Sequence, residues 1–243
     1  MSDSPLVQIQ DWYQRIPPIT RVLVTLAVGL GTAHKIGFGL YPTYFDWDLI
    51  IQQFQLWRLF TGFFADILSL TAIFQWYFFT QFSSELEKDL FNERKGDGIF
   101  FVGLIMVGVA LATFYMPFFN LFPGLMSAIL YVWSRRFPTQ PVTLYFGIRF
   151  PGAYLPWVFM AIHFLMDNPT IKLDAIGIVV GHFVNYLTVE NRSQPGGALL
   201  KTPGILVRWF GGENNPTPVS GRGRPARNAG GGHPWGHGHR LGG

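Results

Sequence analysis

The chain has 243 residues, with 18 Lys and Arg against 14 Asp and Glu, and it contains no cysteine. Only 13% of its residues are charged, 49% are hydrophobic and the mean hydropathy is positive, whereas about a quarter of the residues in a soluble domain are charged. These values exclude an ordinary soluble domain, a disulfide framework and a thiolate metal site, and they indicate a polytopic membrane protein.

Apolar segments follow one another along most of the chain. The N-terminus lacks the pattern of a removable signal peptide, and residues 11–19 form a short amphipathic segment suited to the headgroup level. The last three apolar segments offer only about 14 residues each, fewer than the about 20 that cross a bilayer, so we expect them to thin the lipid around them. The sequence predicts six spans, at residues 22–40, 67–82, 98–119, 120–133, 153–166 and 173–190.

The segment between the first two spans, residues 41–66, alternates aromatic and polar residues without a sustained apolar run. We therefore expect a loop that lies in the membrane interface. Trp57 and Arg58 lie within it. One interpretation is an interfacial contact, with Trp57 at the headgroups and Arg58 reaching a phosphate. The other is a structural clamp that holds the loop against the bundle.

The distribution of basic residues predicts the orientation. The most charged block, residues 83–97, is expected in water. If the N-terminus is cytosolic and there are six spans, 15 of the 18 Lys and Arg residues lie in cytosolic segments, and only Lys35, Arg58 and Lys172 lie on the other side. Because cytosolic loops carry an excess of Lys and Arg, this asymmetry favours six spans with both termini in the cytosol.

The last predicted span carries its small and polar residues on one face. Side chains three and four residues apart share a face of a helix, and five residues follow these steps: Asp174, Gly177, Gly181, Asn185 and Thr188. The other positions are mainly apolar and suit lipid, while the two glycines let a second helix approach closely. We expect the stripe to face the interior of a helical bundle.

After Glu190 the composition changes, which predicts a membrane domain over residues 1–190 and a cytosolic tail over 191–243. A short apolar piece, residues 205–210, is expected to dock at the cytosolic surface. From Gly211 onward the tail is rich in Gly, Pro, Asn and Arg, and we expect it to be disordered. Its arginines are interpreted as lipid contacts or an orientation signal, not as a nucleic-acid site. His233, His237 and His239 lack carboxylates around them, so no metal site is predicted.

Several motifs resemble the rhomboid superfamily: Trp57-Arg58 between the first two spans, the six spans themselves, and Gly177 and Gly181 in the last one. Within that superfamily the chain is more similar to the Derlin branch, and the similarity covers nearly its whole length. The segments that carry it are DWYQRIPPITR (11–21), FQLWR (54–58), SAILYVW (127–133), FGIRF (146–150), YLPWV (154–158), GH (181–182) and TP (202–203). The resemblance implies an all-α, six-span rhomboid-like bundle.

An active rhomboid pairs a serine on its fourth span with a histidine three residues before the first glycine of the sixth-span pair. In this chain Asp174 stands at the position of the histidine. When Tyr131 and Trp133 are aligned with the similar triplet of rhomboids, Phe122 stands at the position of the serine. Because a carboxylate is a poor base for a serine hydroxyl, the resemblance implies a pseudoprotease without catalytic residues.

A different serine and histidine could still form a catalytic pair. The candidates are Ser127 with His182 and Ser127 with His163. Ser127 lacks the flanking glycines of the rhomboid motif, and His182 lies about 100° away from the glycine stripe. We expect the Ser127 hydroxyl to bond within its own helix and His182 to pack near the cytosolic half of the bundle.

Derlins are proteins of the endoplasmic reticulum that help to move misfolded lumenal and membrane proteins to the cytosol for degradation. The resemblance therefore implies a role in retrotranslocation that needs no cofactor. The implied partners are a membrane ubiquitin ligase, the valosin-containing AAA ATPase, misfolded proteins and the bilayer. Gln75 and Gln81 are candidates for a hydrated groove. Assembly with copies of itself or with other chains stays open.

The C-terminal segment, residues 234–242, resembles the short box by which Derlins bind the N-terminal domain of that ATPase. The residues that match are Trp235, Gly236, Gly238, Arg240 and Leu241. An aromatic side chain and a leucine can fill pockets, while the glycines let the backbone lie close to a partner strand. Two alternatives to this function remain, an intramembrane serine protease and a structural membrane scaffold or channel component.

Overall fold

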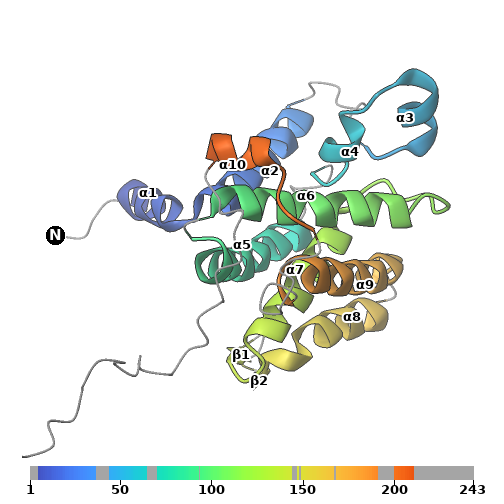
Figure 1. Cartoon of the computed structure of the whole chain (residues 1–243). Coiled ribbons are helices and arrows are strands. Elements are labelled where there is room, and N and C mark those ends of the chain that lie inside the picture. The colour runs from blue at the N-terminus through green and yellow to red at the C-terminus, as the bar shows by residue number, and fades with distance from the viewer. Residues whose placement is uncertain are drawn as a thin grey trace, which may run out of the picture.

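The structure is a computed structural model that describes residues 5–36, 44–64, 70–92, 94–143, 147, 149–166, 168–190 and 200–210. This part of the chain is mostly helical (Figure 1). Its α-helices are α1 (Pro5–Arg15), α2 (Pro18–Lys35), α3 (Trp47–Gln53), α4 (Arg58–Thr61), α5 (Leu70–Leu90), α6 (Lys95–Ala112), α7 (Phe122–Arg136), α8 (Leu155–Leu165), α9 (Ile171–Thr188) and α10 (Gly204–Phe210). The predicted helical class is confirmed, although the described residues also include a small β-hairpin.

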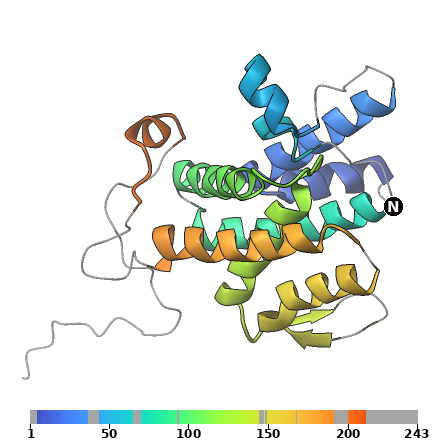
Figure 2. The ribbon, with the colours of Figure 1, turned by 90° about the vertical axis from the view of Figure 1, so that its right-hand side faces the viewer.

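The hairpin joins α7 to α8 and was not predicted. Strands β1 (Pro141–Thr143) and β2 (Arg149–Pro151) pair antiparallel, with Val142 opposite Phe150, and a 3-10 turn, η3 (Gly152–Tyr154), leads into α8. The hairpin and α8 lie at the bottom of Figures 1 and 2, whereas α3 and α4 lie at the top. Pairing across three residues leaves too short a pattern for a sequence to reveal.

Two helices end at other residues than the spans predicted over them, and the span boundaries themselves stay predictions. The second span was predicted to end at residue 82, but α5 continues to Leu90 through the charged block, because Glu, Lys and Leu sustain a helix in water as well as in lipid. The third was predicted to reach residue 119, but α6 ends at Ala112. There the Thr113 hydroxyl donates to the Ala110 carbonyl at 2.8 Å.

Helix α7 forms the centre of the bundle. Asn120 Oδ1 accepts a hydrogen bond from the Phe122 N–H at 2.9 Å, and Pro123 in the first turn has a backbone angle suited to a helix start. Arg135 and Arg136 in the last turn complement the negative end of the helix dipole. Almost every residue between these ends is buried, and the helix packs against α5, α6, α8 and α9.

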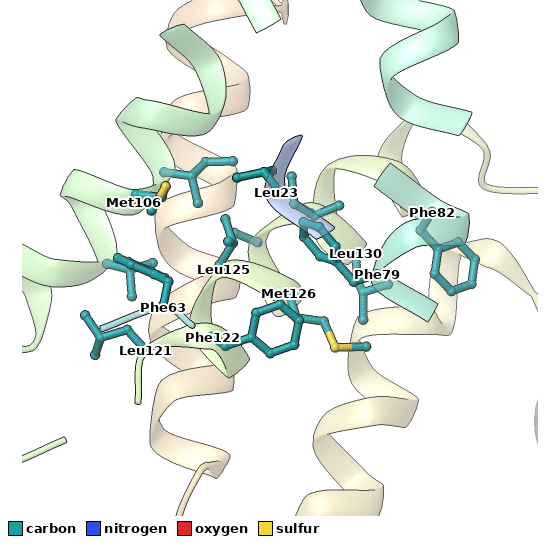
Figure 3. Close-up of a cluster of buried hydrophobic side chains, with 14 of the residues drawn as sticks. Leu23, Phe63, Phe79, Phe82, Met106, Leu121, Phe122, Leu125, Met126 and Leu130 are labelled. Carbon is teal, nitrogen blue, oxygen red and sulfur yellow. The ribbon is translucent and has the colours of Figure 1, made fainter. Parts of the chain in front are cut away.

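The hydrophobic core surrounds α7. Figure 3 shows side chains from four other parts of the chain that meet those of α7. They are Leu23 of α2, Phe63 just after α4, Phe79 and Phe82 of α5, and Met106 of α6. They pack around Leu121, which precedes α7, and Phe122, Leu125, Met126 and Leu130 of α7. The ring of Phe122 stacks on Trp76 with 4.2 Å between the ring centroids. Close packing of these side chains contributes van der Waals contacts between the helices of the described bundle.

Two buried carboxyl groups connect elements far apart in the sequence. Glu87 of α5 accepts hydrogen bonds from the N–H groups of Ile19 and Thr20, at 2.8 Å each, at the start of α2. Asp97, in the first turn of α6, accepts a hydrogen bond from the hydroxyl of Thr202. The second bond fastens the chain just before α10, which packs against α6. The predicted docking piece, residues 205–210, is therefore a helix that contacts the bundle.

One described helix, α6, is both long and apolar enough to cross a bilayer; Pro18–Ala33 and Gly152–Leu165 are apolar but shorter. The six-span arrangement stays a prediction.

Candidate functional site

Helices α7 and α9 pack closely against each other at the predicted glycine stripe. All five stripe residues, Asp174, Gly177, Gly181, Asn185 and Thr188, are buried, whereas Val179 and Phe183 on the opposite face are more than half exposed. The prediction that the stripe faces the interior is therefore confirmed.

The two glycines are required by this close contact. A Cβ atom added at Gly177 would lie 2.2 Å from the carbonyl oxygen of Gly124 and 3.0 Å from Cβ of Ser127. A Cβ atom at Gly181 would lie 2.9 Å from the carbonyl oxygen of Ala128. Because these neighbours are mostly backbone atoms, α7 and α9 could not keep their separation with larger residues at either position.

A buried polar cluster lies beside the glycine contact. Ser127 Oγ of α7 donates to Asp174 Oδ1 of α9 at 2.7 Å. His163 Nδ1 of α8 lies 2.5 Å from Asp174 Oδ2, and since a carboxylate can only accept, the ring nitrogen is the donor. The exposed fraction of the residue is 3% for Ser127, 1% for Asp174 and 8% for His163. The Ser127–Asp174–His163 cluster thus joins three helices.

The order of the three groups determines what chemistry they can perform. In a serine hydrolase the imidazole lies between the hydroxyl and the carboxylate, so that it can take the hydroxyl proton. Here the carboxyl group of Asp174 lies between Ser127 and His163, and each of its oxygens is occupied by one of them. Among the residues that the structure describes, no serine hydroxyl is hydrogen-bonded to a histidine ring. The arrangement suits a polar connection between helices.

The other proposed partner of Ser127 lies elsewhere. His182 Nδ1 is 2.9 Å from the hydroxyl of Tyr131, on the exposed side of α9, so the pairing of Ser127 with His182 is contradicted. The expectation that Ser127 bonds within its own helix was also wrong, because its hydroxyl reaches across to α9. Phe122, aligned with the rhomboid serine, is buried against Trp76.

The loop with Trp57 and Arg58 forms two short helices. Arg58 is buried, and its guanidinium donates to Gln55 Oε1 and to the Tyr44 carbonyl at 2.6 Å each. Trp57 is about half exposed. These two bonds of Arg58 lie inside the loop, and its predicted role as a clamp against the bundle stays a prediction.

Gln75 and Gln81 differ in their surroundings. Gln81 lines a cavity of about 610 Å³ between α5, the end of α7 and β1, and Gln75, which is half-buried, does not. The residues of the C-terminal box, Trp235, Gly236, Gly238, Arg240 and Leu241, and the histidines at 233, 237 and 239 lie outside the described residues.

Two features of the polar cluster were missed in the sequence. Asp174 was recognised as a replacement for a histidine but not as a bonded group, and His163 was considered only as a partner of Ser127. The signal was present: an acidic residue on a stripe expected to be buried requires a hydrogen-bond donor. Which helix supplies that donor depends on the packing of α8 against α9, which spacing along the chain does not reveal.

Comparison with known proteins gives a consistent result. The family model of the Der1-like family matches residues 16–204. The chain is 33% identical to Derlin-1 of Mus musculus over 251 residues, and 32% identical to Derlin-1 of Homo sapiens over the same length, covering 96% of this chain and 98% of each relative. It is also 32% identical to the probable derlin-1 homolog of Dictyostelium discoideum over 245 residues, covering 96% of this chain and 99% of that one.

Proposed function

Because the chain belongs to the Der1-like family, we propose that it is a non-catalytic factor of the endoplasmic reticulum membrane that assists retrotranslocation of misfolded lumenal and membrane proteins to the cytosol. In this proposal it serves ER-associated degradation together with a membrane ubiquitin ligase complex and the valosin-containing AAA ATPase. Family membership makes the chain a membrane protein of the derlin type. The partners and the process are the proposal.

The observation that carries the non-catalytic part is the order of groups in the Ser127–Asp174–His163 cluster. Deprotonation of Ser127 would require Asp174, a weak base, to accept the proton while it also holds His163. The cluster is also enclosed by helices, with little room for a peptide carbonyl beside the hydroxyl. These points weigh against the alternative of an intramembrane serine protease.

Ser127 is expected not to react with a serine-directed fluorophosphonate probe, because no base activates its hydroxyl. The purified full-length chain in mild detergent would be compared with its Ser127→Ala variant, with an active serine hydrolase in the same detergent as a positive control. Labelling of the unaltered chain that disappears in Ser127→Ala would contradict the proposal and favour a protease.

Helix length supports a role in disturbing the bilayer. The α7 helix has 15 residues and α8 has 11. At 1.5 Å per residue these helices extend for about 23 Å and about 17 Å, compared with about 30 Å of hydrocarbon in a typical bilayer. Short helices thin the lipid around them, and a thinner bilayer lowers the cost of moving polar backbone across it. We propose that this is how the bundle assists translocation.

The orientation proposed here is multi-pass with both termini in the cytosol, as the distribution of Lys and Arg favours. That orientation puts the C-terminal box on the side of the ATPase. The box is Trp235, Gly236, Gly238, Arg240 and Leu241. An aromatic residue, a leucine and intervening glycines suit an extended segment that adds to a strand edge.

Changing Trp235, Gly236 and Leu241 together to Ala is expected to reduce recovery of the AAA ATPase in a pull-down to background, because the pocket-filling groups are lost. Degradation of a misfolded membrane substrate should slow in parallel. The matched control is Trp209→Ala, which removes an exposed tryptophan outside the box. Unchanged ATPase recovery in the triple variant would instead favour a structural scaffold or channel component.

A further inference from the structure

Two adjoining cavities follow the outer face of α5. The larger, of about 610 Å³, lies between α5, the end of α7 and β1. The smaller, of about 250 Å³, lies between α5 and α1. Tyr77, Gln81 and Glu85 line both, so the two cavities meet along one side of the helix. Figure 1 shows α5 between α1 and the hairpin. We call the combined space the α5 groove.

The α5 groove changes polarity along its length. Its larger part is lined mainly by apolar side chains, among them Ile73, Phe74, Phe78, Phe82 and Val142. Its smaller part is lined by Trp12, Arg15, Thr80, Ser84 and Lys88. The apolar end lies toward the apolar start of α5 and the cationic end toward its charged terminus. An amphiphile with a long apolar part and an anionic head matches this gradient.

The two cations at the narrow end have no acidic partner. Neither Arg15 nor Lys88 forms an ion pair with any residue in the described ranges. Two acidic groups on α5 are engaged elsewhere: Glu87 caps α2, and Asp89 pairs with Arg136. The smaller cavity therefore presents two positive charges toward a ligand.

Among the described residues that line the groove, Glu85 is the one acidic side chain. Its Oε2 accepts from Trp133 Nε1 at 3.1 Å and its Oε1 accepts from Gln140 Nε2 at 3.0 Å. Both oxygens are thus directed to α7 and the segment before β1. One negative charge against two positive ones leaves the cationic end net positive.

Ser84 adds an independent indication of a polar ligand. Its hydroxyl oxygen is buried and has no hydrogen-bond partner, although a serine in a helix usually bonds back to its own turn. It lines the same small cavity as Lys88, one turn farther along α5. A buried hydroxyl without a partner costs free energy, and an acceptor oxygen from a ligand would remove that cost.

We propose that the α5 groove binds an anionic phospholipid, with its net negative headgroup at Arg15 and Lys88 and one acyl chain along Phe74 and Phe78. Basic pockets between helices at a membrane surface are suited to anionic headgroups, and Trp12 is suited to the same depth. The second acyl chain stays in the bilayer. The proposal requires a membrane protein but does not depend on the retrotranslocation role.

The test is native mass spectrometry of the full chain, titrated in mild detergent with palmitoyl-oleoyl phosphatidylserine or phosphatidylcholine. The double variant Arg15→Gln/Lys88→Gln is expected to bind phosphatidylserine roughly thirtyfold more weakly, since each cation near a membrane surface contributes about 1 kcal/mol, and to change little toward phosphatidylcholine. The matched control is Lys201→Gln/Arg208→Gln, which removes two exposed cations on the α10 side. It should leave both affinities unchanged.

A second variant tests whether lipid occupies the junction between the two cavities of the α5 groove. Gln81→Trp would fill the junction of the two cavities and should reduce binding of both lipids. Ser84→Ala should weaken phosphatidylserine a few-fold. Equal affinities in the double variant and in the unaltered chain would overturn the proposal, and so would no effect of Gln81→Trp. Full displacement of phosphatidylserine by inorganic phosphate would identify a simple anion site and overturn the proposal. If the variants lost binding only of an apolar peptide and kept binding of both lipids, the groove would be a polypeptide site, which also overturns the proposal.

Discussion

Replacing Asp174 with alanine is expected to lower the free energy of unfolding by about 2 to 6 kcal/mol, because each of the two buried donors that lose their acceptor costs about 1 to 3 kcal/mol. The change leaves the hydroxyl of Ser127 and the ring of His163 buried without their acceptor. It also opens a space where α7, α8 and α9 meet. Equilibrium unfolding of the purified chain in mixed micelles measures this loss.

The control for this prediction is Asp89→Ala, which removes a carboxyl group from the partly exposed pair with Arg136. Exposed pairs contribute about 0 to 1 kcal/mol. A double-mutant cycle adds a second check, because Ser127→Ala should cost less in the Asp174→Ala background than alone. If Asp174→Ala costs no more than Asp89→Ala, the cluster does not hold the helices together.

Replacing Gly177 with alanine is expected to destabilise the chain by about 3 kcal/mol, toward the upper end for an added methyl group in a packed core. The new Cβ would meet the Gly124 carbonyl oxygen at 2.2 Å, and since that neighbour is backbone, α9 must move away from α7. The same micelle unfolding measurement applies. The movement would also lengthen the Ser127–Asp174 hydrogen bond.

Gly103→Ala is the matched control. A Cβ atom at Gly103 of α6 has no atom within 4 Å, so alanine should stabilise that helix by roughly 0.5 to 1 kcal/mol through its better helix propensity. The two substitutions are chemically identical, and only their surroundings differ. Similar stabilities for both variants would mean that α7 and α9 do not approach as closely as the structure has them.

Periodicity predicted the parts of the fold that depend on one helix at a time. The stripe from Asp174 to Thr188 follows from steps of three and four residues, and its burial was predicted correctly. The predicted spans do not give helix ends, because a change from apolar to charged residues marks a change of solvent, whereas a helix continues as long as its backbone bonds are made. This is why α5 passes residue 82.

Contacts between elements could not be predicted in the same way. The bond from His163 to Asp174 depends on how α8 lies against α9, and the hairpin at Val142 depends on a pairing of three residues. Motif positions identified Asp174 as unusual, yet its role follows from which side chains surround it. The candidate site was therefore located by sequence, while its chemistry required the structure.

The bond between Thr202 and Asp97 has a mechanical consequence. It lies before α10, so a pulling force applied to the chain beyond Phe210 is transmitted through α10 and reaches α6 at Asp97. The load then enters the bundle at the first turn of α6, and the bond from the Leu200 N–H to the Leu187 carbonyl passes a second part of it to the last turn of α9.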